Sequence, residues 1–128
     1  MLATTPTMKH FSIFLFVFAC ISIANAQSFT YKKGLVTIDE TECMQVSKSS
    51  GTHVFSDMDE DEVIYLKSFQ EEGVWYSEVV FVASGKKMKS TYTFKPKGLI
   101  KSLLDTKVFD GCYLDESKIQ NFILKYQR

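Results

Sequence analysis

The fold is decided by residues 62–94, which read EVIYLKSFQEEGVWYSEVVFVASGKKMKSTYTF. β-branched and aromatic residues gather there in three runs, and short polar turns that contain glycine separate the runs. The runs are 62–69, 74–83 and 88–94, and the turns are Glu71-Glu72-Gly73 and Ser84-Gly85-Lys86. Runs of this composition are typical of strands, and such short connections favour antiparallel pairing of sequence neighbours. The stretch therefore predicts three consecutive strands of one antiparallel sheet.

Alternation within the runs indicates which sides of the strands are covered. The run 74–83 is apolar on both sides, so we expect a central strand with both faces covered. In the run 88–94, Met88, Tyr92 and Phe94 share one side while lysine and threonine occupy the other. That run predicts a strand with one solvated face.

The same pattern continues upstream as far as Phe29. Four further short β-prone runs are separated by turn residues; they are 29–31, 35–38, 43–46 and 52–56. Together the runs predict an antiparallel β-meander of six or seven strands.

Two helices are predicted after the sheet. Pro96 can open the first helix, and Asp115 can cap the second, with Leu114 packing onto Ile119. The apolar stripes are Leu99, Ile100, Leu103 and Leu104 in the first helix and Ile119, Phe122, Ile123 and Tyr126 in the second. Helices with one apolar stripe pack on a sheet, so the sequence predicts an α+β fold with a single domain over residues 27–128.

Residues 1–26 carry the pattern of a secretory signal peptide. Lys9 and His10 precede the apolar run 11–23, and Ala24-Asn25-Ala26 fits a cleavage site, so we expect the mature protein to begin at Gln27. The basic residues directly after Met8 suggest that Met8 is the true start and that residues 1–7 are not translated. We therefore expect a secreted or periplasmic protein without a transmembrane segment in its mature chain. The alternative is a lipoprotein acylated at Cys20, which the bulky Phe18 disfavours.

Cleavage at that site would leave two cysteines, Cys43 and Cys112. An even pair in an oxidising compartment favours an intramolecular disulfide that ties the early strands to the C-terminal region. A free reactive thiol or a bridge between two molecules is the alternative.

Charge is balanced overall, with 15 basic and 15 acidic residues. A nucleic-acid-binding domain is usually basic, so we expect no nucleic-acid partner. Acidic residues dominate 39–78 and basic residues dominate 79–128. The two halves either neutralise each other as neighbours or form a dipolar surface that steers a charged partner.

Catalytic and metal-binding patterns are sparse. The carboxylates Asp57, Asp59 and Asp61 resemble the start of an EF-hand, but Glu62 and Ser68 stand where glycine and glutamate belong, so we expect a solvated hairpin turn. Weak calcium binding at this turn is the alternative. His53 lies in a predicted strand with no nucleophile motif and too few partners for zinc. We expect neither a bound metal nor a cofactor.

Aromatic residues crowd the strands of residues 62–94, and most must belong to the core. Trp75 and Tyr76, beside the turn at Gly73, are the candidates for an exposed patch. Such a patch can stack on a sugar ring or anchor a protein partner.

Several short motifs resemble small exported bacterial proteins of unassigned function. They are Asp39-x-x-x-Cys43, Phe55-Ser56-Asp57, Ile64-Tyr65-Leu66-Lys67 and Cys112-x-Leu114. In such proteins a glycine often follows the acidic turn, where this chain has Glu60 or Asp61. The resemblance implies a shared exported domain and brings no catalytic residues with it.

Three functions follow from these observations. The favoured hypothesis is a non-catalytic binding or structural module of the cell envelope or exterior, with another protein or an envelope glycan as partner. The second is an inhibitor or neutraliser of another protein that uses the acidic turn 57–62 to attract it. The third is a small hydrolase that combines carboxylates with His53.

Overall fold

The structure is a computed structural model that describes residues 27–127. The predicted signal peptide, including Met8, Cys20 and Ala26, lies outside the described residues. Seven strands form one sheet in which each strand pairs antiparallel with its neighbours in sequence. They are β1 (Phe29–Lys32), β2 (Leu35–Ile38), β3 (Thr41–Ser49), β4 (Thr52–Asp57), β5 (Glu62–Glu71), β6 (Val74–Phe81) and β7 (Lys87–Ser90). The predicted antiparallel meander is confirmed.

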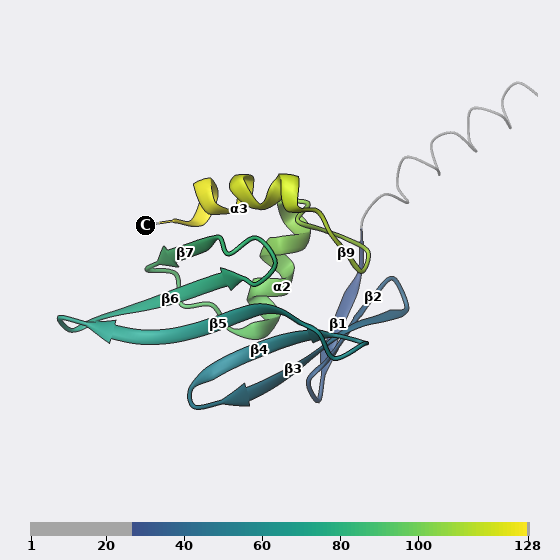
Figure 1. The fold of residues 1–128 in the computed structure, drawn as a ribbon, viewed down its shortest axis with the longest axis horizontal. Coiled ribbons are helices and arrows are strands. Elements are labelled where there is room, and N and C mark those ends of the chain that lie inside the picture. Colours follow the sequence, from purple (N-terminus) through teal and green to yellow (C-terminus); the bar gives the residue numbers. More distant parts are fainter. Residues whose placement is uncertain (1–26, 128) are drawn as a thin grey trace, which may run out of the picture.

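Two helices follow the sheet, as predicted, and complete an α+β fold (Figure 1). Helix α2 (Pro96–Asp105) begins at its proline, and all four residues of its predicted stripe are buried. The second helix begins as a single 3₁₀ turn, η1 (Glu116–Lys118), and continues as α3 (Ile119–Tyr126). The Asp115 side chain accepts a hydrogen bond from the Ser117 backbone N–H, so the predicted cap is confirmed. Among the described residues, no helix has the length and apolar character needed to span a membrane.

The core lies between one face of the sheet and the two helices. Phe55, Ile64, Leu66 and Val79 point from the strands into the same cluster as Leu99 and Phe122 of the helices. Two serines are also fully buried on this face and satisfy backbone groups. Ser77 Oγ accepts a hydrogen bond from the Phe94 N–H, and Ser90 Oγ donates one to the Tyr126 carbonyl. The two serines therefore fix the segment after β7 and the end of α3 to the sheet.

The prediction that residues 74–83 are covered on both faces is wrong. Ser77, Val79 and Phe81 of β6 are fully buried, whereas Tyr76 and Val80 on the opposite face are only partly buried. Both helices contribute to the one core, so nothing in residues 27–127 forms a layer on the outer face. Strand β6 is also next to the edge of the sheet, because only β7 lies beyond it.

The predicted last strand is shorter than expected. Strand β7 ends at Ser90, whose side chain turns the chain by accepting a hydrogen bond from the Tyr92 N–H. Phe94 still reaches the core, with 9% of its surface exposed. The segment 91–95 therefore leads to α2 rather than extending the sheet.

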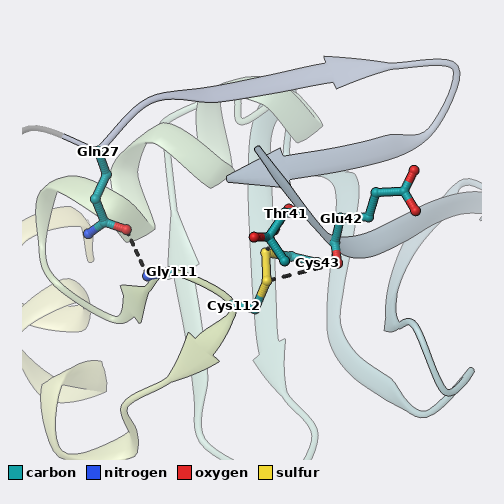
Figure 2. The surroundings of a disulfide bond; sticks show 6 residues. All are labelled: Gln27, Thr41, Glu42, Cys43, Gly111 and Cys112. Atoms are coloured by element: carbon teal, nitrogen blue, oxygen red, sulfur yellow. Dashed lines mark hydrogen bonds between the residues drawn. A yellow bond between two sulfur atoms is a disulfide. The ribbon is translucent and has the colours of Figure 1, made fainter. Parts of the chain in front are cut away.

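A short hairpin between the two helices was not predicted. It pairs β8 (Phe109–Asp110) with β9 (Tyr113–Leu114), and Gly111 and Cys112 form its turn. The Cys43–Cys112 disulfide joins this turn to β3, which confirms the predicted pairing (Figure 2). The Gly111 N–H donates a 2.7 Å hydrogen bond to Gln27 Oε1, which is a second attachment of this turn. The hairpin between the helices is thus attached to both the first described residue and the sheet.

Candidate functional site

The β5–β6 hairpin extends past the rest of the sheet and ends at the turn around Gly73 (Figure 1). Residues Ile64 to Glu71 of β5 pair without interruption with Phe81 to Val74 of β6, so the projecting end is a regular ladder. Trp75 lies near the end and is 57% exposed, and Val74 beside it is 45% exposed. Within residues 27–127 the Trp75 ring makes no aromatic or cation contact. An exposed indole on a regular hairpin is a typical anchor for a partner.

Trp75 and Tyr76 do not form one patch, because consecutive strand residues point to opposite faces. On the Tyr76 face, the ring stacks on Phe69 with centroids 5.8 Å apart. Lys89 Nζ lies 4.4 Å from the centre of the Tyr76 ring and 2.7 Å from a carboxylate oxygen of Glu71. The hydrogen bond to Glu71 raises the pKa of the Lys89 ammonium, so this group stays charged. The Tyr76 ring therefore already contacts Phe69 and Lys89. The Trp75 ring is exposed and can stack on a partner.

The neighbours of Trp75 in the β5–β6 ladder, on its own face of the sheet, are neutral and polar. Gln70 lies directly opposite Trp75 in the ladder, and Ser68 is two residues further along the same face of β5. Both side chains are exposed and can donate and accept hydrogen bonds. This face therefore combines one stacking surface with neutral hydrogen-bonding groups.

The acidic turn between β4 and β5 is a solvated hairpin turn, as predicted. Asp57 Oδ1 accepts hydrogen bonds of 2.9 Å from the N–H groups of Asp59 and Asp61, which closes the turn. Glu60 adopts a φ of 68°, the left-handed conformation that favours glycine. The carboxylate of Asp57 therefore has a structural role in addition to its charge.

The structure brings this turn together with the start of the second helix, which the sequence did not predict. An open groove of about 660 Å³ is lined by carboxylates from both segments and by the exposed Tyr113. The carboxylates are those of Asp57, Asp61, Glu62, Asp115 and Glu116, whereas Asp59 does not line the groove. Of residues 27–127, no lysine or arginine lines the groove, so its lining favours cationic groups.

His53 stands apart from the acidic turn. It lies near the start of β4, about 13 Å along the strand from Asp57, and it pairs with Lys48 of β3. Burial is the main cause that lowers the pKa of His53, and the positive charge of Lys48 lowers it further. A lysine rather than a carboxylate is thus its charged neighbour. Among the described residues, no three His, Cys, Asp or Glu side chains are grouped to hold a metal ion.

Residues 27–127 form a disulfide-linked α+β domain, and within this range no layer covers the outer face of the sheet. Comparison of the chain with protein-family models, with curated proteins and with solved structures found no match. The function proposed below therefore rests on the side chains of this protein.

Proposed function

We propose that this protein is an exported, non-catalytic binding module and that Trp75 anchors its partner, an envelope glycan or another extracellular protein. The observation that carries the proposal is the exposed indole at the end of the β5–β6 hairpin. Exposing so large an apolar ring to water is unfavourable, and a partner that covers it recovers this free energy.

A glycan fits this face better than a charged protein surface does. Sugar rings present C–H groups that stack on an indole, and their hydroxyl groups need neutral donors and acceptors at the edge of the ring. Gln70 and Ser68 supply such groups on the face of Trp75. We therefore take an insoluble glycan as the first partner to test.

Export is supported by two features. Residues 9–26 carry the signal-peptide pattern, and Cys43 and Cys112 form a disulfide. Disulfides persist in oxidising compartments outside the cytoplasm. Export would bring Trp75 into a compartment in which envelope glycans occur.

The test is co-sedimentation of the purified protein with peptidoglycan, chitin and cellulose. Trp75→Ala should weaken binding to the recognised glycan about tenfold or more, because buried anchor residues contribute that much. Leu124→Ala is the matched control, since Leu124 is a 73% exposed apolar residue on α3. Equal binding by the wild type and Trp75→Ala would exclude the site. Cross-linking of the hairpin to an exported protein, lost in Trp75→Ala, would instead identify the partner as a protein.

A second candidate function is an inhibitor or neutraliser of a basic protein. The observation in its favour is the groove in which Asp61, Asp115 and Glu116 converge beside Tyr113 with no neutralising base in its lining. An aromatic ring within an acidic rim suits a lysine or arginine side chain.

A lysine-rich peptide is the probe for this second function. Glu116→Lys should abolish its binding, whereas Glu72→Lys, at the opposite end of the molecule, should leave binding unchanged. Binding should also weaken steeply between 0.1 and 1 M salt, where the screening length falls from about 10 to about 3 Å. Affinity that is independent of salt would contradict an electrostatic mechanism.

A further inference from the structure

A second groove runs along the solvent side of α2 and has a mainly aromatic wall. Tyr92 and Phe94 from the segment after β7, Tyr126 from α3 and Phe29 from β1 line it, and its volume is about 790 Å³. The Tyr126 ring lies 5.4 Å from that of Tyr92 and 5.5 Å from that of Phe94, measured between centroids. Phe94 is backed by the core residue Phe122, so the wall is well supported. A groove of this volume can hold a small organic ligand.

The opposite wall of this groove carries an excess of positive charge. Lys95, Lys97 and Lys101 line it, and Asp105 is the single acidic residue that residues 27–127 contribute to the lining. Asp105 pairs with Lys101 at 3.1 Å. Within residues 27–127, Lys95 and Lys97 form no salt bridge. Two ammonium groups are therefore available to an anion beside an aromatic surface.

The start of α2 adds to this preference for an anion. Lys95 precedes the helix without a side-chain cap, and the first turn contains no acidic residue. The backbone N–H groups of Lys97 and Gly98 thus remain at the positive end of the helix dipole. Both residues line the groove.

Gly98 keeps the groove open between the lysines and the aromatic wall. A Cβ atom added at Gly98 would meet no atom within 4 Å, so no packing contact requires a glycine there. Glycine is also a poor helix former. Gly98 is exposed and lines the groove, so its missing side chain leaves the space beside the lysines open.

We propose that the α2 groove binds a single-chain anionic amphiphile, such as a long-chain fatty acid. The hydrocarbon tail covers the aromatic wall formed by Phe29, Phe94 and Tyr126, and the carboxylate lies among Lys95, Lys97 and the start of α2. The open groove offers an aromatic strip to a single hydrocarbon chain, whereas a membrane surface would require projecting apolar side chains. This site shares no residue with the hairpin face of Trp75, so it stands independently of the proposed function.

Isothermal titration calorimetry with dodecanoate, below its micelle concentration, tests the proposal. Dodecanoate should bind. Butanoate lacks the hydrocarbon tail and dodecyltrimethylammonium carries the opposite charge, so each of them should bind at least tenfold more weakly than dodecanoate. Amide NMR shifts should change at Gly98 and Ser102 and remain constant at Gln70. Equal affinity for the anionic and cationic amphiphiles would overturn the proposal. So would binding to phosphatidylglycerol vesicles without binding to monomeric dodecanoate.

Two variants locate the site. Gly98→Leu places a side chain in the groove at a position where an added Cβ meets no atom within 4 Å, so it should abolish dodecanoate binding while the melting temperature stays the same or rises. Lys97→Glu should weaken binding about tenfold, and the matched charge reversal Lys86→Glu, in the turn before β7, should not. Wild-type affinity in a folded Gly98→Leu protein would refute the assignment of the groove.

Discussion

Removing the Cys43–Cys112 disulfide should cost this domain a large part of its stability. The perturbation is the double variant Cys43→Ala/Cys112→Ala, studied beside the reduced wild type. Cys43 is 4% exposed and Cys112 is exposed, so the reduced wild type keeps the packing of Cys43 and loses only the covalent link. The double variant additionally loses the buried sulfur atom.

The magnitude follows from the length of the closed loop. The two cysteines are 69 residues apart, and closing a loop of that length in the unfolded chain corresponds to about 4 kcal/mol at 25 °C. Truncating Cys43 to alanine should add about 1 kcal/mol because it leaves a small cavity. Domains of this size unfold with about 5–15 kcal/mol, so the double variant should be marginally folded at 37 °C.

The assay is urea denaturation followed by far-ultraviolet circular dichroism. Trp75 fluorescence is a poor probe here, because the indole is exposed in the folded protein. The oxidised wild type, the reduced wild type and the double variant should fall in that order of unfolding free energy. A difference below about 1 kcal/mol between oxidised and reduced wild type would refute the loop-entropy reasoning.

Three further perturbations test individual residues by the same denaturation assay. Glu60→Gly should stabilise the protein by about 0.5–1 kcal/mol, because Glu60 has a φ of 68°; destabilisation would mean that its side chain makes an important contact. Ser77→Ala should destabilise it by about 1–3 kcal/mol, because the Phe94 N–H would remain buried without an acceptor; no loss would indicate that water replaces the hydroxyl. Burial and Lys48 lower the pKa of His53, so the unfolded chain binds its proton more tightly. The free energy of unfolding should therefore decline as the pH falls below about 6.5, and His53→Asn should reduce this decline. The same pH profile in the wild type and in His53→Asn would contradict this reasoning.

The sequence was most informative where structure depends on local patterns. The number and order of the strands, the Asp115 cap and the stripe from Leu99 to Leu104 all depend on neighbours in sequence, and they were predicted correctly. The disulfide was predictable because Cys43 and Cys112 are the two cysteines that remain if residues 1–26 are removed as the predicted signal peptide.

Features that depend on tertiary packing were missed. The apolar residues of 74–83 suggested cover on both faces, but whether a second layer exists is decided by the rest of the chain. The acidic groove joins Asp61 to Glu116, which are too distant in sequence for any pattern to connect. The separation of Trp75 from Tyr76, by contrast, follows from strand alternation and was available in the sequence.

The disulfide supports the Trp75 face and the acidic groove unequally. Figure 1 shows β9 and the end of the β5–β6 hairpin at opposite ends of the molecule. Strand pairing holds Trp75 in place. Residues 113–116, which form one wall of the acidic groove, belong to a surface segment, and the disulfide at Cys112 fixes this segment beside the sheet.

Surface segments such as residues 110–118 open locally at a lower free energy than the core does. The segment 110–118 lies between the buried residues Phe109 and Ile119, so it can open while both ends remain packed. Mild reduction should therefore weaken binding of the lysine-rich peptide before it weakens glycan binding through Trp75. Equal loss of both activities would mean that the disulfide stabilises the whole domain and has no particular effect on the groove.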